Sequence, residues 1–273
     1  MTSKIVAAVL MDALLVIGIG KNGNYIASDQ MALLSKTNKF IFLEEGDIAE
    51  VRLNKITIYN LDGKIVNRPV QKSMLKAGQA DKGNFDHFMQ KEIYEQTETI
   101  SHTISEMYNA NGQMSKKLSQ IIKENPNSIT ILAAGTSYYA GQIGKYWIES
   151  LSKIPVNVEI ASEFRYRKPF IDPKGLVITI SQSGESIDTL MAMRHAQKFG
   201  VKSVAIINSI GSTIDRESNY SLYTRAGAEI AVASTKAFTA QLAVLACLAI
   251  NFSKKRGFIS KKENSELIDE LVS

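Results

Sequence analysis

Three clusters of small hydroxyl residues carry the clearest chemical signal in the 273-residue sequence. Gly135, Thr136 and Ser137 follow the β-prone run SITILAA, and the motif SQSGES at 181–186 follows the run GLVITI. The third cluster, VASTK at 232–236, precedes a long apolar segment. A glycine permits a tight turn, and hydroxyls together with the free backbone N–H groups at a helix start bind anions. The clusters therefore predict a site for an anion such as phosphate, or for sugar hydroxyls.

A purely structural explanation of the same clusters stays open, because Ser and Thr are good helix N-caps. We expect Ser234 or Thr235 to cap the helix that follows the third cluster. Lys236 either neutralises a phosphate or is simply solvated. Glu185 and Asp188 either complement the dipole of the helix after the second cluster or act in catalysis. Binding is favoured because all three clusters are expected at one edge of a sheet.

Other kinds of site are disfavoured by the sequence. GTSYYAG is not the G-x-G-x-x-G fingerprint of dinucleotide binding and lacks a suitable acidic residue about 20 positions later. No Walker G-x-x-x-x-G-K-[ST] loop and no G-x-S-x-G nucleophile elbow occur. His87, His102 and His195 lie on expected helices, away from cysteine or acidic residues at ligand spacing, so we expect no metal site.

The elements that must position these clusters change in kind along the chain. Up to about residue 75, short β-prone runs alternate with turns, and Asp62-Gly63 predicts a tight hairpin. Residues 85–124 follow a helical period, which Asn125-Pro126-Asn127 ends. Strands and helices then alternate from about 127 to 255, as is typical of parallel βαβ units in an open doubly wound sheet. In such a sheet, ligands bind outside the carboxyl ends of the strands.

The composition is that of an ordinary globular protein, with 45% hydrophobic and 22% charged residues. These values exclude disorder and a disulfide-stapled miniprotein. The net charge of +5 favours anionic ligands only weakly, and we expect no nucleic acid partner. The single cysteine, Cys247, is expected in the core, which is compatible with a cytoplasmic protein. Asp12 interrupts the apolar N-terminal stretch, which predicts two buried strands and no membrane segment.

Longer runs resemble a known family. They are FIFLEEGDIAE (40–50), MQKEIYEQ (89–96), AGTSYYAG (134–141), ASEFRYRK (161–168), SQSGESIDT (181–189) and EIAVASTKAFTAQ (229–241). In this order they resemble glutamine–fructose-6-phosphate aminotransferase, the isomerising glucosamine-6-phosphate synthase, over nearly the whole chain. The resemblance implies an α/β fold: a SIS-type (sugar isomerase) doubly wound parallel sheet in an αβα sandwich. A β-rich remnant of an N-terminal-nucleophile glutaminase domain and a helical linker are implied to precede it.

The resemblance also implies domain boundaries and site residues. Residues 1–75 correspond to a partial glutaminase (type 2 glutamine amidotransferase) domain, 76–126 to the linker and helices, and 127–273 to the first SIS domain. The implied phosphate ligands are Ser181, Gln182, Ser183 and Ser186, and the residues implied to line the sugar are Thr136, Ser137, Val232 and Ser234. Ala134 stands where relatives usually have cysteine, and Ser186 where threonine is usual.

The family transfers the amino group of glutamine to fructose 6-phosphate and isomerises the product to glucosamine 6-phosphate without a metal or organic cofactor. Its glutaminase cysteine, acid–base glutamate, partner-contributed histidine and C-terminal lysine have no counterpart in this sequence. We therefore expect no catalytic residue here and no complete turnover by this chain alone. The implied ligands are fructose 6-phosphate and glucosamine 6-phosphate, and the implied assembly is a homodimer through the SIS domain. The alternatives are a non-catalytic sugar-phosphate-binding regulatory module and a fragment without a role of its own.

Overall fold

The computed structural model describes residues 6–9, 15–28, 30–44, 46–73 and 82–272. The chain divides into two compact units, residues 1–81 and 82–273. The predicted boundary between residues 75 and 76, and parts of the first predicted strand, lie outside the described residues.

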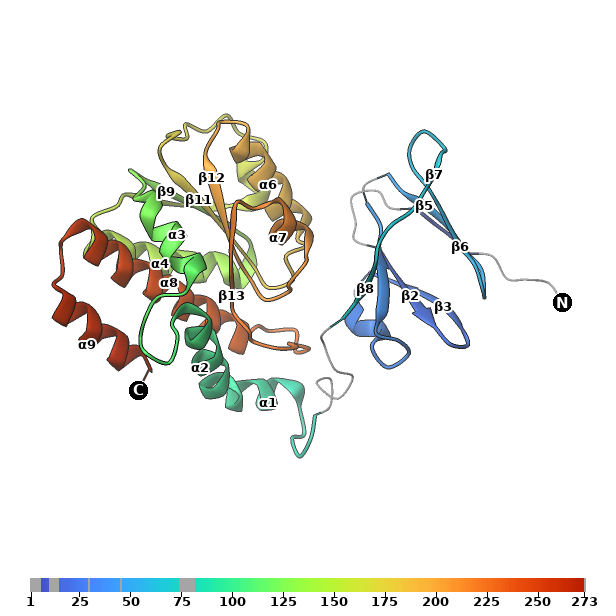
Figure 1. Cartoon of the computed structure of the whole chain (residues 1–273), viewed down its shortest axis with the longest axis horizontal. Helices are drawn as coiled ribbons and strands as arrows, with labels where there is room; N and C mark the ends of the chain where they lie inside the picture. Colours follow the sequence, from blue (N-terminus) through green and yellow to red (C-terminus); the bar gives the residue numbers. More distant parts are fainter. Residues whose placement is uncertain (1–5, 10–14, 29, 45, 74–81, 273) are drawn as a thin grey trace. The chain divides into compact units, whose positions relative to one another are not determined.

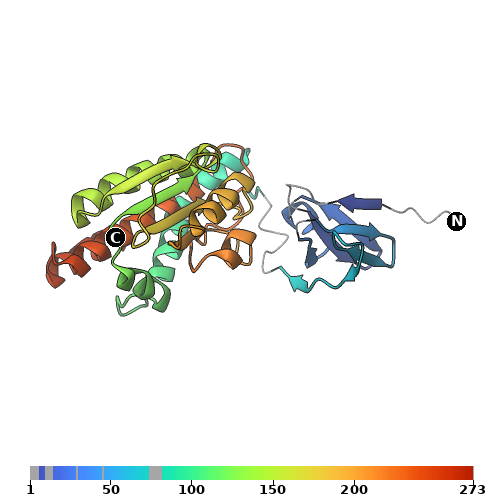
Figure 2. The ribbon, with the colours of Figure 1, turned by 90° about the horizontal axis from the view of Figure 1, so that it is seen from above.

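The first unit is built from short antiparallel strands, drawn in blue to teal in Figures 1 and 2. One sheet has the strand order β1-β5-β6-β7 and the other β3-β2-β4-β8. The elements are β1 (Val6–Val9), β2 (Val16–Gly20), β3 (Gly23–Ala27), the 3-10 helix η1 (Gln30–Leu33), β4 (Lys39–Phe42), β5 (Ile48–Val51), β6 (Ile56–Tyr59), β7 (Ile65–Val66) and β8 (Val70–Lys72). The two sheets share one apolar cluster, since Ile17 and Ile41 of one sheet pack with Ala49, Val51 and Ile58 of the other.

The hairpin predicted at Asp62-Gly63 is confirmed. Strands β6 and β7 pair antiparallel on either side of this turn. The Asn60 side chain accepts hydrogen bonds from the N–H groups of Asp62 and Lys64, at 3.1 and 3.0 Å. Gly63 has φ +72°, a left-handed conformation that a glycine adopts without strain.

The second unit alternates strands and helices after three N-terminal helices. Its helices are α1 (Phe88–Tyr94), α2 (Gln96–Met107), α3 (Lys116–Glu124), α4 (Gly135–Ser152), α5 (Ala161–Phe164), α6 (Ile187–Gln197), α7 (Thr213–Glu217), α8 (Lys236–Arg256) and α9 (Lys261–Val272). Its strands are β9 (Ile129–Ala133), β10 (Val156–Ile160), β11 (Leu176–Ser181), β12 (Lys202–Ile207) and β13 (Tyr220–Tyr223). The sequence predicted that α3 ends here, and Asn125 is its C-cap residue in the left-handed conformation.

The five strands form one parallel sheet in the order β10-β9-β11-β12-β13. This confirms the predicted α/β fold. Because β10 and β11 flank β9 on opposite sides, the winding reverses between β9 and β11. In doubly wound sheets this switch point is where ligands bind.

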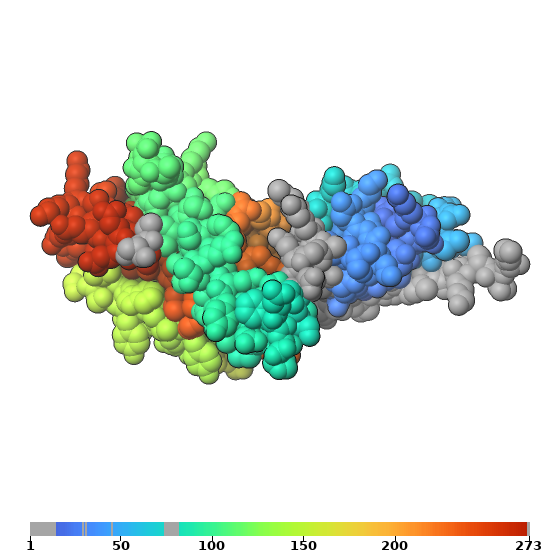
Figure 3. Space-filling model, turned by 90° about the horizontal axis from the view of Figure 1, so that it is seen from below, coloured from blue at the N-terminus to red at the C-terminus, as the bar shows by residue number. Residues whose placement is uncertain are grey.

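Helices cover both faces of the sheet, which makes the second unit a three-layer αβα sandwich (Figure 1). Alternate strand residues explain this, because successive side chains point to opposite faces. Ile129, Ile131 and Ala133 pack with α3, α4 and α8. Leu132, from the same strand, packs with α5 and α6 on the other face. Figure 3 shows residues 88–126 (teal to green) and the C-terminal helices (red) gathered on one face of this unit.

Helix α8 is long and apolar enough to cross a membrane by length and composition alone. However, 78% of its apolar 18-residue stretch is buried inside the protein. That burial is typical of a core helix. Gly144 of α4 permits a close approach, because a Cβ there would lie 2.9 Å from a methyl group of Leu245. Cys247 is buried, as predicted, and its burial raises the pKa of its thiol to about 12.

Two features of the second unit differ from the sequence analysis. Helix α7 and strand β13, at 213–223, were not expected, and β13 supplies the fifth strand. The helical period of 85–124 corresponds to three helices, interrupted around the isolated bridge between Tyr108 and Met114.

Candidate functional site

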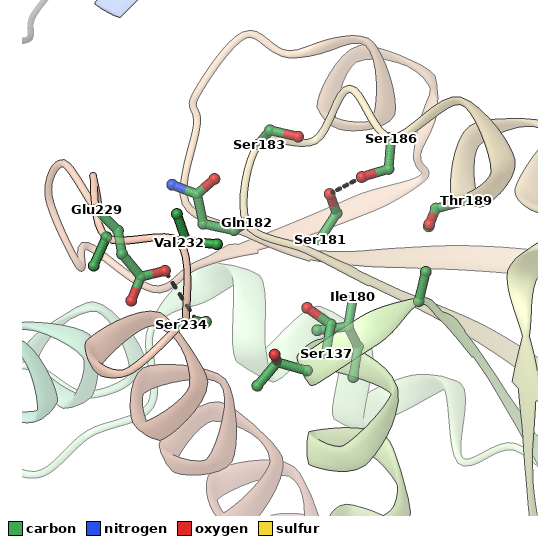
Figure 4. A pocket seen from close by; sticks show the side chains of 13 residues that line it. Ser137, Ile180, Ser181, Gln182, Ser183, Ser186, Thr189, Glu229, Val232 and Ser234 are labelled. Atoms are coloured by element: carbon green, nitrogen blue, oxygen red, sulfur yellow. Dashed lines mark hydrogen bonds between the residues drawn. The ribbon is translucent and has the colours of Figure 1, made fainter. Parts of the chain in front are cut away.

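A cavity of about 300 Å³ opens at the carboxyl ends of β9 and β11, at the switch point of the sheet. Its size is at the lower end of the range for small-molecule sites. Figure 4 shows side chains from three loops facing it. The lining residues are Ala134, Thr136, Ser137, Ile180, Ser181, Gln182, Ser183, Ser186, Thr189, Glu229, Ala231, Val232 and Ser234. All eight residues proposed from the sequence are in this set, so the structure brings them together; their role in binding stays a prediction.

The serine loop, residues 181–186, connects β11 to α6. The Ser181 hydroxyl accepts a hydrogen bond from the N–H of Gly184 at 3.0 Å and lies 3.3 Å from the Ser186 hydroxyl. The Ser183 hydroxyl accepts from the N–H of Glu185 at 3.2 Å. Gly184 makes this turn possible, since its φ is +67° and a Cβ would lie 2.0 Å from the Ser212 hydroxyl. Hydrogen bonds from the loop's own N–H groups to the Ser181 and Ser183 hydroxyls thus hold the loop in its turn.

The first turn of α6 keeps its donors open. Ser186 is the N-cap residue, but its side chain makes no capping hydrogen bond. The N–H groups of the first turn therefore lack the usual side-chain acceptor. Thr189, in the same turn, is only 1% exposed, and its hydroxyl has no hydrogen-bond partner within the described residues. Open N–H groups, hydroxyls and the positive end of the helix dipole together suit a phosphate.

The GTS loop, residues 135–137, connects β9 to α4. Gly135 has φ +56° and begins α4. The Ser137 hydroxyl accepts a hydrogen bond from Nε2 of Gln241 at 3.0 Å, which ties this loop to α8. Gln241 is buried, and the sequence analysis did not select it. Thr136 is exposed at the cavity and is free to meet a ligand hydroxyl.

The pre-helix loop, residues 229–235, runs into α8 and forms the opposite wall. One Glu229 oxygen accepts hydrogen bonds from the N–H groups of Thr235 and Ala237, at 2.8 and 3.1 Å. Its other oxygen accepts from the Ser234 hydroxyl at 3.0 Å. The expectation that Ser234 or Thr235 is the cap residue of α8 is confirmed for Thr235, but the capping acceptor is not its own side chain. Thr235 occupies the N-cap position without a side-chain bond, and the Glu229 carboxylate satisfies the donors instead.

Lys236 takes neither of the two roles considered for it. Its side chain is buried, and its Nζ lies 2.7 Å from a carboxylate oxygen of Glu95, just before α2. It does not line the cavity. A lysine is buried here because a carboxylate compensates its charge.

Glu185 of the serine loop and Asp188 of the first turn of α6 both contact residues outside the cavity. Asp188 pairs with Arg165, with 2.8 Å between Nη1 and Oδ1. Glu185 accepts a hydrogen bond from the N–H of Thr213 at 2.8 Å and thereby caps α7. Burial raises the pKa of Glu185 above its ordinary value, more than the hydrogen bonds with Thr213 and the charge of Arg216 lower it. Neither acid lines the cavity, so their contacts are structural.

The three histidines lie outside this cavity. His195 stacks edge-on against Phe164 and Phe199. Within the part of the chain that the structure describes, no group of three or more His, Cys, Asp or Glu residues could hold a metal ion.

Two polar lining residues were missed from the sequence, Thr189 and Glu229. Thr189 stands three residues after the Ser186 N-cap, a position that a capping analysis could have selected. Glu229 has no local signal, because its role depends on how the loop folds back. It is the one ionisable residue among those lining the cavity, and its oxygens are already engaged. The groups that remain open to a ligand are hydroxyls, an amide and backbone N–H groups, which are suited to binding.

Comparison with known proteins agrees with this geometry. Residues 121–251 match the family model of the SIS domain. The chain is 47% identical over 263 residues to the glutamine–fructose-6-phosphate aminotransferase [isomerizing] of Haemophilus influenzae, covering 95% of this chain and 43% of that protein. It is also 47% identical to the enzyme of that name from Yersinia pseudotuberculosis, covering 89% and 41%.

A solved structure supports the same assignment. The C-terminal domain of glucosamine-fructose-6-phosphate aminotransferase from Francisella tularensis superposes with a TM-score of 0.67 at 43% identity, covering 70% of this chain and 54% of that one. The chain thus spans about two fifths of the length of the curated relatives it matches. Residues 121–251 are a SIS domain, and the chain resembles the glutamine–fructose-6-phosphate aminotransferase family over nearly all of its length.

Proposed function

We propose that the cavity binds a hexose 6-phosphate, either fructose 6-phosphate or glucosamine 6-phosphate. The observation that carries this proposal is the open first turn of α6 beside the hydroxyls of the serine loop. The phosphate lies on Ser181, Gln182, Ser183 and Ser186 and on the helix N-terminus. The lining residues include no Lys or Arg, so N–H groups, hydroxyls and the helix dipole compensate the phosphate charge.

The sugar lies between the GTS loop and the pre-helix loop, against Thr136, Ser137, Val232 and Ser234. Hydroxyls on both walls offer donors and acceptors to the sugar. The reaction is the one named for the relatives: transfer of the glutamine amino group to fructose 6-phosphate with isomerisation to glucosamine 6-phosphate. In this reaction the cavity holds and orients the sugar phosphate, since its one ionisable group, Glu229, caps α8.

The proposal includes the arrangement of the chain. Residues 1–75 are part of a type 2 glutamine amidotransferase domain, 76–126 a helical linker, and 127–273 the first SIS domain of a cytoplasmic homodimer. The β-rich first unit and the SIS match at 121–251 support this division. The dimer is supported by exposed aromatic residues on the outer face of α4, where Tyr139 and Tyr146 are two turns apart. Light scattering on the purified chain tests it, and a monomer would remove the dimer from the proposal.

Calorimetric titration with fructose 6-phosphate tests the binding site. The Ser181→Ala, Ser183→Ala double variant should bind at least about tenfold more weakly, because each removed hydroxyl leaves a phosphate oxygen without its donor. The matched control is Ser105→Ala, Ser150→Ala, which removes two exposed serines outside the cavity. Circular dichroism melts establish that each protein is folded, and fructose without phosphate serves as the control ligand.

Each outcome has a clear meaning. A folded parent chain that does not bind fructose 6-phosphate contradicts the proposal. If the double variant binds fructose 6-phosphate as tightly as the parent chain, the phosphate does not lie on the serine loop. Incubation with fructose 6-phosphate and glutamine should yield no glucosamine 6-phosphate, and its formation would show that this chain holds catalytic residues outside those lining the cavity.

A further inference from the structure

The pre-helix loop is held by two carboxylates, and only one of them belongs to the loop. Glu229 accepts hydrogen bonds from the N–H groups of Thr235 and Ala237, at the end of the loop that enters α8. At the other end, the N–H groups of Ile230 and Ala231 donate to Oε1 of Glu92 in α1, at 2.6 and 3.1 Å. These donors and their acceptor are 138 and 139 residues apart in the sequence.

The described surroundings of Glu92 indicate no role for this residue other than holding the pre-helix loop. The residue is only 2% exposed, and its Oε2 is buried without a hydrogen-bond partner within the described residues. Among these residues no Lys or Arg forms an ion pair with it. Burying a carboxylate is costly unless hydrogen bonds compensate the lost hydration. The two loop N–H groups supply that compensation, so the carboxylate and the loop hold each other in place.

A second contact from the same helical segment reinforces the first. Glu95 pairs with the buried Lys236 across 2.7 Å, directly after the pre-helix loop. Glu92 and Glu95 are three positions apart, a spacing that places side chains on one helical face. The segment 92–95 therefore contacts the start of the loop at residues 230–231 and the first residue of α8, Lys236, which follows the loop directly.

We infer that Glu92 is a positioning residue for the sugar wall of the cavity. It does not line the cavity, but it binds the N–H of Ala231, which does, and Val232 follows directly. The inference rests on the proposed function, because it assigns this wall to the sugar and the serine loop to the phosphate. Losing Glu92 should then weaken binding of the sugar moiety and leave binding of the phosphate moiety intact.

Titrations of Glu92→Ala, Glu92→Gln and the parent chain with fructose 6-phosphate and with inorganic phosphate test this split. Glu92→Ala should lose about tenfold in affinity for fructose 6-phosphate and stay within about twofold for inorganic phosphate. Glu92→Gln should bind both like the parent, because its Oε1 still accepts from both N–H groups. Glu98→Ala is the matched control, since Glu98 is an exposed carboxylate of α2 outside the cavity.

Amide hydrogen exchange measured by NMR gives a readout without a ligand. The amides of Ile230 and Ala231 should exchange slowly in the parent and in Glu92→Gln, and at least about tenfold faster in Glu92→Ala. The amides of Thr235 and Ala237, which Glu229 holds, should keep their rates.

The outcomes separate this inference from the proposed function. A parent that does not bind fructose 6-phosphate overturns the proposed function and this inference with it. Unchanged fructose 6-phosphate affinity in Glu92→Ala overturns the inference alone, as does a parallel loss of inorganic phosphate affinity, which would show a general role in folding. Should Glu92→Ala not fold, Glu92→Asp retracts the carboxylate by one methylene, and the same split in affinities is required of it.

Discussion

The serine loop and the pre-helix loop look alike in sequence and differ in how their backbone donors are used. Both carry small hydroxyl residues and both lead into a helix. In the serine loop, the Ser181 and Ser183 hydroxyls bind N–H groups of the loop itself, and the first turn of α6 stays open. In the pre-helix loop, the Glu229 carboxylate fills the donors at the start of α8.

This difference shows why a helix N-terminus alone does not predict an anion site. The dipole and the free N–H groups exist at every helix start, and a carboxylate of the chain can satisfy them as well as a ligand phosphate can. At α8 the chain supplies the anion, so this wall is shaped for a neutral ligand. At α6 no side chain caps the first turn, which supports the proposal that a ligand phosphate binds at the serine loop.

Gly184→Ala should have the largest effect of the variants considered, because it disrupts the serine loop itself. A left-handed residue with a side chain costs about 1–2 kcal/mol, and the new Cβ would also lie 2.0 Å from the Ser212 hydroxyl. The loop must then shift, and affinity for both fructose 6-phosphate and inorganic phosphate should fall well over tenfold by calorimetry. Gly200→Ala is the control for the conformation alone, because φ there is +79° with nothing near the Cβ. Equal affinities for the two variants would show that the serine loop tolerates rearrangement.

Glu229→Ala should convert the pre-helix loop toward the open state of the serine loop. Removing the cap exposes the N–H groups of Thr235 and Ala237 and should lower the free energy of unfolding by about 1–2 kcal/mol. Urea unfolding followed by the fluorescence of Trp147, the single tryptophan, reports on the second unit. Adding inorganic phosphate should reduce this loss of stability, because the phosphate can bind the N–H groups that are freed at the start of α8. Glu229→Gln keeps an acceptor and should lose little; a loss as large as that of the alanine variant would contradict the capping role.

Thr189→Val tests whether the open turn of α6 offers a buried hydroxyl to the phosphate. The substitution is close to isosteric and removes a hydroxyl that has no partner, so the stability of the unliganded chain should be equal or slightly higher. Affinity for fructose 6-phosphate should fall about threefold to tenfold, and Thr189→Ser should restore it. Unchanged affinity in both variants would place the phosphate nearer the loop hydroxyls than the helix turn.

The part of the site that the sequence predicts is the part encoded locally. A β-prone run followed by glycine and hydroxyl residues places the GTS loop and the serine loop at strand ends, and parallel strands bring those ends to one edge. This logic locates the loops, whereas the choice of eight residues within the three loops came from the resemblance to the family. The same logic missed β13, because the run YSLY at 220–223 is short and half polar.

The part that could not be predicted depends on contacts between distant segments. Nothing near Glu92 in the sequence indicates that it binds the N–H groups of Ile230 and Ala231. The sequence left two roles open for Lys236, neutralising a phosphate or being solvated, but a carboxylate 141 residues away pairs with it. The partners of these charged residues are set by contacts that exist only in the folded chain. Their roles are therefore the hardest to predict from the sequence.

Glu185→Gln addresses the smallest difference between the loops, a carboxylate within the serine loop that caps α7 and not α6. Burial raises the pKa of Glu185 above 4.5, so the folded chain holds the proton more tightly than the unfolded chain. Stability therefore falls as the pH rises from 4.5 through the raised pKa, and the penalty is complete above it. The variant carries no charge, and its stability relative to the parent should increase over that window in urea unfolding followed by Trp147 fluorescence. The stability difference between Glu185→Gln and the parent could instead stay constant with pH, or match that of the exposed control Glu98→Gln. Either result would mean that hydrogen bonds compensate the charge of Glu185 as fully as those of a capping carboxylate such as Glu229. The serine loop and the pre-helix loop would then differ less than the structure indicates.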